Sequence, residues 1–98
     1  MLLAALLAFA PSQDFITTLV WSQSGRCVYQ TGDVFLGAAD FRGNLVGAAR
    51  NYRGIFIFHP PNVPRRCLNN ARRIARSAGF MQIRVELAPA DLSMRPPA

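Results

Sequence analysis

The sequence predicts a small α+β protein, in which an antiparallel β-meander of four to five strands is closed by one β-α-β unit. Three observations predict this fold class. The 98 residues suit one domain, and 51% of them are hydrophobic, which is enough to supply a core. Short apolar stretches separated by turn residues fill the first half of the chain, as is typical of strands. A segment with helical periodicity and one with two-residue periodicity follow in the second half.

The meander is predicted from a series of short stretches. Residues 15–21 and 26–30 are rich in β-branched and aromatic side chains and are separated by turn residues. Residues 34–39 and 44–50 are two further strand candidates, joined by a connection that ends in glycine and suits a hairpin. Residues 55–58 are apolar at every position, which indicates a central strand covered on both sides.

A helix is predicted to begin after Asn62, which can cap it, to hold Pro64 in its first turn and to end at Gly79. Six apolar residues within it share one arc of about 120° at helical spacing. These are Cys67, Leu68, Ala71, Ile74, Ala75 and Ala78. Residues 81–87 then alternate between apolar and polar, as in a half-buried strand. Strand, helix and strand with short joins predict a parallel crossover.

The predicted domain spans residues 13–88, between an apolar N-terminal segment (1–12) and an extended proline-rich tail (89–98). Residues 1–10 are uncharged, and Ala8-Phe9-Ala10 resembles a signal cleavage site, although no basic residue precedes it. This segment is therefore either a signal remnant or a short helix that packs on the domain or on a neighbouring subunit. No apolar run reaches the length of about 18 residues that a transmembrane helix needs. The residues do not indicate a compartment.

Five of the eleven basic residues, all of them arginines, lie within the predicted helix. Together with one asparagine they share an arc of about 120° opposite the apolar one. We call these six residues the arginine face: Arg65, Arg66, Asn69, Arg72, Arg73 and Arg76. Residues 63–79 contain no Asp or Glu. Like charges three or four residues apart cost roughly 0.2–0.5 kcal/mol each in an isolated helix. An uncompensated cluster of this kind suggests an anionic partner.

Arginine suits planar contacts with carboxylates and with phosphates, so that several partners fit. The leading hypothesis is a non-catalytic binding or assembly module, whose arginine face contacts an anionic partner. This partner is either a phosphate or an acidic protein surface, on another protein or on a second copy of the chain. Nucleic acid is one alternative and anionic lipid a less favoured one. Aromatic residues among the cations would favour nucleic-acid binding, but the helix has none, and Tyr52, Phe56 and Phe58 lie just upstream of it. The simplest alternative is a solvated face that binds no partner.

A sharper hypothesis places an anion at the start of the helix. His59 is the only histidine and ends the apolar strand, and a strand that leads into a helix often forms a binding site at that end. His59, Asn62, Arg65 and Arg66 would then hold a phosphate or a carboxylate. The alternative is a histidine that merely ends a strand.

Catalytic and metal-binding roles find little support in the sequence. The five acidic residues are scattered, and one histidine with two separated cysteines does not form a closed zinc site. No catalytic residue, metal ligand or cofactor is therefore predicted. Cys27 and Cys67 permit one disulfide, which would stabilise the fold by roughly 4 kcal/mol. Free buried cysteines are equally consistent with the sequence.

The second half of the chain carries one resemblance. Gly43-Asn44-Leu45-Val46-Gly47 precedes a strand that ends in His59-Pro60, and a helix that ends in Ala75-Arg76-Ser77-Ala78-Gly79 follows. In this order residues 43–87 resemble the second half of a GCN5-related N-acetyltransferase. The resemblance implies an acyl-CoA-binding domain in which residues 66–71 correspond to the family's Arg/Gln-x-x-Gly-x-Gly/Ala pyrophosphate loop. Asn69 stands where that loop has its first glycine. The resemblance supplies the enzymatic alternative to a binding module.

Overall fold

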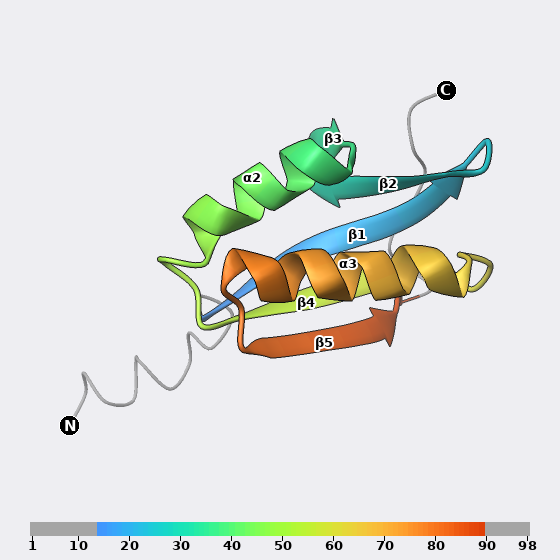
Figure 1. Ribbon diagram of the computed structural model, residues 1–98. Coiled ribbons are helices and arrows are strands. Elements are labelled where there is room, and N and C mark those ends of the chain that lie inside the picture. The colour runs from blue at the N-terminus through green and yellow to red at the C-terminus, as the bar shows by residue number, and fades with distance from the viewer. Residues whose placement is uncertain (1–13, 90–98) are drawn as a thin grey trace.

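We describe residues 14–89 of the protein from a computed structural model (Figure 1). The chain forms β1 (Phe15–Gln23), β2 (Arg26–Thr31), β3 (Val34–Leu36), α2 (Ala38–Ala48), β4 (Gly54–His59), α3 (Arg65–Ala78) and β5 (Gln82–Leu87). The strands form one five-stranded sheet in the order β3-β2-β1-β4-β5. β1, β2 and β3 are antiparallel neighbours, whereas β4 runs parallel to β1 and β5 runs parallel to β4. The α+β class and the strand-helix-strand unit of β4, α3 and β5 are thereby confirmed.

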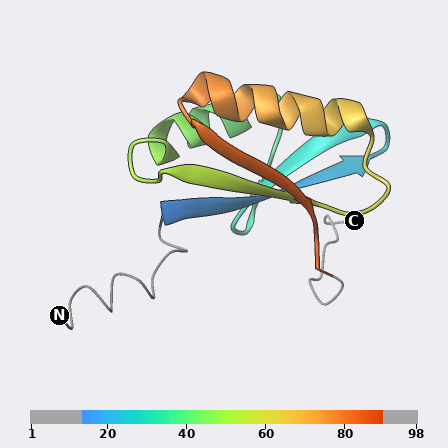
Figure 2. The ribbon, with the colours of Figure 1, turned by 90° about the horizontal axis from the view of Figure 1, so that it is seen from below.

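Both helices lie on the same face of the sheet, so that the described residues form two layers (Figure 2). α2 packs over β2 and β3, and α3 packs beside α2 over β1 and β5. Along β4, Ile55 and Ile57 face the helices, whereas Phe56 and Phe58 alternate to the other side. Among residues 14–89, helices therefore cover β4 on one side only. On the other side Phe56 contacts the rings of Phe15 and Phe58, at centroid distances of 4.8 and 5.9 Å.

The hydrophobic core lies between the helices and the sheet. Tyr29 on β2 stacks on Phe41 of α2, with ring centroids 4.5 Å apart and planes 4° from parallel. The core consists of Val20, Tyr29, Phe41, Leu45, Ile55, Ile57, Val63, Cys67, Ala71, Ala75, Ala78 and Phe80. Small alanines on the inner side of α3 let that helix approach the sheet closely.

The helix predicted from the apolar arc is confirmed as α3. Gly79 ends it in the left-handed region, with a φ of 118°. The prediction that Asn62 caps this helix is wrong. Pro64 holds the N-cap position in an extended conformation, and no side chain of the described residues caps the helix. Its φ of −60° would suit a helix but its ψ of 144° is extended, so that the first residue with helical geometry is Arg65.

The prediction of a strand over residues 44–50 is wrong, because residues 38–48 form α2. The preceding strand, predicted over 34–39, is confirmed only as far as Leu36, where β3 ends. The antiparallel part of the sheet therefore holds three strands, and the total of five is reached with the parallel strands β4 and β5.

Burial of one apolar pair explains why this segment is helical. Phe41 and Leu45 lie one turn apart and are both fully buried. Gly43 and Gly47 favour a non-helical backbone, but each costs only about 1 kcal/mol relative to alanine in a helix. Burying two large side chains contributes roughly 1.5–3 kcal/mol each, which outweighs that cost.

The predicted N-terminal segment and nearly all of the predicted tail lie outside the described residues, apart from Pro89. The two interpretations of residues 1–10 therefore stay open. No helix within residues 14–89 is long and apolar enough to cross a membrane.

Candidate anion-binding helix face

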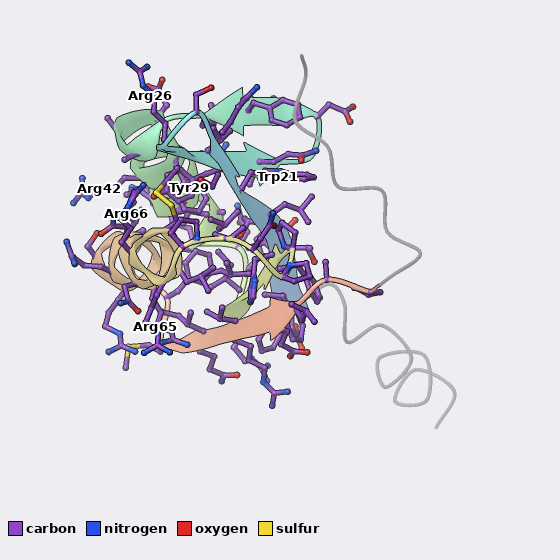
Figure 3. The ribbon with its side chains drawn as sticks, turned by 90° about the vertical axis from the view of Figure 1, so that its right-hand side faces the viewer. Trp21, Arg26, Tyr29, Arg42, Arg65 and Arg66 are labelled. Atoms are coloured by element: carbon purple, nitrogen blue, oxygen red, sulfur yellow. A yellow bond between two sulfur atoms is a disulfide. The ribbon has the colours of Figure 1, made fainter. Side chains whose placement is uncertain are left out.

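The arginine face lies on the outer side of α3, and all six of its residues are exposed. The opposite side of the helix buries Cys67, Ala71, Ala75 and Ala78 against the sheet. In Figure 3 the labelled Arg65 and Arg66 lie on the helix side of the molecule, whereas Trp21 lies on the other side of the sheet. The amphipathic pattern in the sequence thus corresponds to one buried side and one exposed side of α3.

None of the five arginines on this face has an acidic partner in the described part of the chain. The ion pair found among residues 14–89 joins Arg53 to Asp14 at 3.9 Å, and both side chains are largely exposed. Asp33, Asp40 and Glu86 do not fold back onto α3 as counterions. The positive charge that the sequence concentrates on this helix therefore stays uncompensated within residues 14–89.

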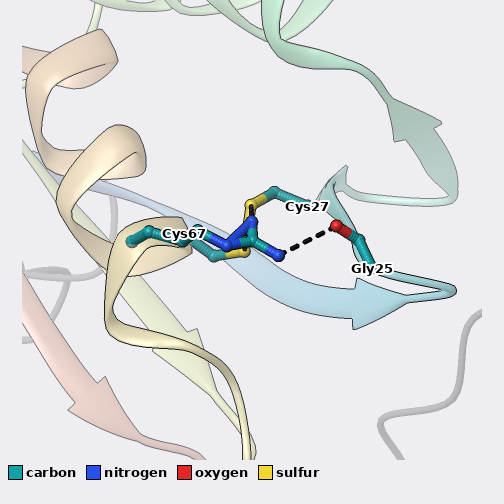
Figure 4. Close-up of a disulfide and its surroundings, with 4 residues drawn as sticks. Gly25, Cys27 and Cys67 are labelled. Carbon is teal, nitrogen blue, oxygen red and sulfur yellow. Dashed lines mark hydrogen bonds between the residues drawn. A yellow bond between two sulfur atoms is a disulfide. The ribbon is translucent and has the colours of Figure 1, made fainter.

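Arg66 differs from the other four arginines because it contacts the chain itself. Its Nη2 donates a hydrogen bond to the carbonyl oxygen of Gly25 at 2.9 Å, in the turn between β1 and β2 (Figure 4). Its Nη1 also lies 3.6 Å from the sulfur of Cys27 and 3.9 Å from that of Cys67. Arg66 therefore joins the first turn of α3 to this turn.

A disulfide between Cys27 and Cys67 makes the same connection covalently, with Cα atoms 5.4 Å apart (Figure 4). It links β2 to the first turn of α3, across a sequence separation of 40 residues. The N-terminal end of the arginine face is thus fixed to the sheet by a covalent bond and by the Arg66 hydrogen bond.

Residues of the arginine face line two shallow hollows. One has a volume of about 430 Å³ and is lined by Asn69, Arg72, Arg73, Arg76 and Ser77. The other lies towards β5, has a volume of about 310 Å³ and is lined by Arg65, Leu68, Asn69, Arg72 and Val85. Asn69 and Arg72 line both hollows and therefore form the ridge between them. Every cation of the arginine face except Arg66 lines one of these hollows.

Arg42 on α2 extends this positive surface and was not predicted as part of it. Its Nε donates a hydrogen bond to the Ser77 hydroxyl at 3.2 Å, and that hydroxyl donates in turn to the Ile74 carbonyl oxygen at 3.0 Å. The sequence predicts Arg42 in a connection between two strands, over residues 40–43. The spacing of Phe41 and Leu45, one helical turn apart, is the signal that could have placed it on a helix.

The structure does not gather His59, Asn62, Arg65 and Arg66 around one hollow. His59 is half-buried, and its Nδ1 donates to the Pro60 carbonyl oxygen at 2.8 Å. Asn62 instead lines a separate hollow of about 330 Å³ with Trp21, Ser22, Pro60 and Val63. Because Arg65 lines the hollow towards β5 and Arg66 contacts Gly25, these four side chains have different surroundings.

The segment that resembles a pyrophosphate loop, residues 66–71, lies entirely within α3. The backbone N–H groups of residues 69–71 therefore donate to carbonyl oxygens one turn earlier in the helix. In the first turn, the N–H of Cys67 donates to the Pro64 carbonyl oxygen at 3.0 Å, so that only the N–H groups of Arg65 and Arg66, which precede Asn69, lack such a partner. A phosphate could not reach the N–H groups that the family's loop offers unless this part of the helix unwound.

The aromatic residues nearest to the arginine face do not lie on it. Phe56 and Phe58 are on the far side of the sheet, and Tyr52 packs against the core.

Burial raises the pKa of the Tyr29 hydroxyl above its usual value of 10.0, although the positive charge of Arg66 acts in the opposite direction. Within residues 14–89, no group of three His, Cys, Asp or Glu side chains could hold a metal ion.

These observations define a two-layer α+β domain, with a disulfide that fixes an amphipathic helix whose outer side is basic. Comparison with known protein families found no match, and neither did a comparison with curated proteins.

Proposed function

We propose that the protein is a non-catalytic binding module, which uses the arginine face of α3 to bind an acidic surface of a partner protein. One observation carries this proposal. Arg65, Arg72, Arg73 and Arg76 are exposed, and among the described residues their side chains make no hydrogen bond or ion pair with the rest of the chain.

The arrangement lowers the stability of the free helix. Arg72 and Arg76 are four residues apart, and Arg73 and Arg76 are three apart, so that each like-charge pair costs roughly 0.2–0.5 kcal/mol. Arg65 and Arg66 also lie in the first turn of α3, where the helix dipole disfavours cations. A carboxylate that accepts two N–H groups of one guanidinium offsets this repulsion and adds charge-assisted hydrogen bonds. An acidic protein partner would therefore stabilise the face that the free chain leaves uncompensated.

An acidic protein fits this face better than the other anionic partners. Binding of single-stranded nucleic acid relies on aromatic rings among the cations, and Phe56 and Phe58 lie on the opposite side of the sheet. A second copy of the chain offers few acids in its described residues, and these four lie on different parts of the structure: Asp14, Asp33, Asp40 and Glu86. The enzymatic alternative loses support because residues 66–71 are helical.

Binding of a fluorescent poly-glutamate peptide to the disulfide-bonded protein tests this proposal. The Arg72→Glu/Arg76→Glu variant is compared with Arg50→Glu/Arg84→Glu, which makes the same change in net charge at exposed positions outside α3. We expect the first variant to bind at least about tenfold more weakly than the wild type, which corresponds to about 1.4 kcal/mol. The second should stay within about threefold, because distant charges are screened by salt.

Two results would overturn the proposal. Equal weakening in both variants would show that net charge alone attracts the peptide. Tighter binding of a single-stranded oligonucleotide than of poly-glutamate, at the same ionic strength, would instead identify nucleic acid as the partner. Circular dichroism of each variant verifies that the fold is retained.

A further inference from the structure

Four residues of the arginine face form a straight stripe along α3. Arg65, Asn69, Arg72 and Arg76 follow one another at intervals of four, three and four residues. At 100° per residue they lie within an arc of about 60°, and at 1.5 Å per residue the stripe is about 16 Å long. The other two residues of the face lie beside it, because at 100° per residue Arg66 and Arg73 fall about 60° and 40° beyond the edge of the stripe. The stripe therefore offers three guanidinium groups and one amide in a line.

The surroundings of the stripe have the shape of a helix-packing surface. Asn69 and Arg72 form a ridge, with one hollow on each side. The hollow towards β5 includes the half-buried apolar side chains of Leu68 and Val85. Two packed helices fit together by placing the side-chain ridge of one into the groove of the other. A partner helix could thus place side chains into both hollows while its acidic residues face the stripe.

We propose, on the basis of the proposed function, that the partner contributes an acidic α-helix with carboxylates at positions i, i+4, i+7 and i+11. Such a helix has the same residue spacing as the stripe, so that each carboxylate lies opposite one side chain of the stripe along about 16 Å. Side chains on one face of an extended strand recur at about 6.7 Å. The stripe residues of α3 are spaced at about 6, 4.5 and 6 Å, so that acids on a strand would not stay opposite them. A helix therefore satisfies the whole stripe, and a strand does not.

The partner helix belongs to a different protein and not to a second copy of the described residues. α2 contains only Asp40 as an acid, and the first turn of α3 contains none. No helix within residues 14–89 therefore carries a row of carboxylates at the required spacing.

Two alanine-rich helical peptides of identical composition test this inference. One carries four glutamates at i, i+4, i+7 and i+11, and the other has the four distributed around the helix. Circular dichroism is used to match their helicity. We expect the striped peptide to bind the wild-type protein at least about tenfold more tightly than the distributed one, which corresponds to about 1.4 kcal/mol.

A charge exchange tests the register of the contact. The Arg72→Glu variant is mixed with striped peptides in which arginine replaces glutamate at i+4 or at i+7. One of the two should recover at least about half of the binding free energy lost in the variant, because a restored opposite-charge pair is coupled in a double-mutant cycle. The position that recovers it gives the orientation of the helix, i+7 for a parallel and i+4 for an antiparallel partner.

The outcomes separate this inference from the proposed function. Equal affinity for the two peptides, with both weakened in Arg72→Glu/Arg76→Glu, would overturn the helical partner and leave the acidic partner supported. Failure of both exchanged peptides to recover binding would also overturn the helical partner. Affinities that do not change in Arg72→Glu/Arg76→Glu would overturn the proposed function itself.

Discussion

The guanidinium group of Arg66 donates a hydrogen bond to the carbonyl oxygen of Gly25 at 2.9 Å, next to the disulfide between Cys27 and Cys67. This contact distinguishes Arg66 from the other arginines of the face. Arg66 holds α3 to the turn between β1 and β2, whereas the other four make no hydrogen bond or ion pair with the described residues.

Replacement of Arg66 should therefore affect stability more than replacement of its neighbour. We expect Arg66→Ala to lower the free energy of unfolding by about 1 kcal/mol, because the hydrogen bond to Gly25 is lost. Arg65→Ala should change it by less than about 0.5 kcal/mol, as surface substitutions usually do. Urea unfolding of both variants measures the difference. Equal effects would contradict the structural role of Arg66.

The sequence was sufficient to predict α3, because six apolar residues at helical spacing leave one arc for the sheet and one for solvent. It was insufficient for α2, where Gly43, Gly47 and the β-branched Val46 favour other conformations. The burial of Phe41, which stacks on Tyr29, and of Leu45 stabilises that helix. The pattern of the local sequence thus predicts α3, whereas α2 depends on tertiary packing.

The candidate site was predicted in part. The arginines of α3 could be found from one segment, since helical periodicity places them on one side. Arg42 and Gly25 could not, because their contacts with Ser77 and Arg66 join residues that are 35 and 41 positions apart in the chain. Such pairs depend on how α2 and the β1–β2 turn pack against α3.

Reduction of the disulfide should destabilise the fold strongly. A cross-link between Cys27 and Cys67 closes a loop over 40 positions, and on the loop-entropy model its loss costs about 4 kcal/mol. Urea unfolding with and without a thiol reductant measures this change. The Cys27→Ala/Cys67→Ala variant should behave like the reduced protein in either condition. An unchanged unfolding midpoint after complete reduction would contradict this expectation.

Two exposed glycines in α2 should be sites of stabilisation. A Cβ at Gly43 or Gly47 would meet no atom within 4 Å. Each change to alanine should therefore raise the free energy of unfolding by about 0.5–1 kcal/mol, since alanine favours a helix. Gly25→Ala is the contrasting variant, because Gly25 has a φ of 79°. It should lower stability by about 1 kcal/mol. Thermal unfolding compares the three variants. Destabilisation by alanine at both Gly43 and Gly47 would contradict the helical structure of α2.

The stability of the protein should fall at alkaline pH through Tyr29. Burial raises the pKa of this hydroxyl above the usual 10.0, so that the unfolded chain ionises first. The contribution of the Tyr29 hydroxyl to folding stability is complete below about pH 10, and it is lost as the pH rises through the pKa of this group in the folded protein. Urea midpoints measured at increasing alkaline pH should fall less steeply in Tyr29→Phe than in the wild type. Tyr52→Phe serves as the control, and identical slopes in all three proteins would rule out this role of Tyr29.

The proposed binding of an acidic partner depends on the position of the positive charge on α3. The ratio of two dissociation constants for the same poly-glutamate peptide, at one ionic strength, measures this dependence. The first is that of Arg72→Glu/Arg76→Glu, and the second is that of Arg50→Glu/Arg84→Glu. We expect a ratio of at least about three, since these variants differ in the position of the charge and not in its amount. A ratio near one would contradict the account.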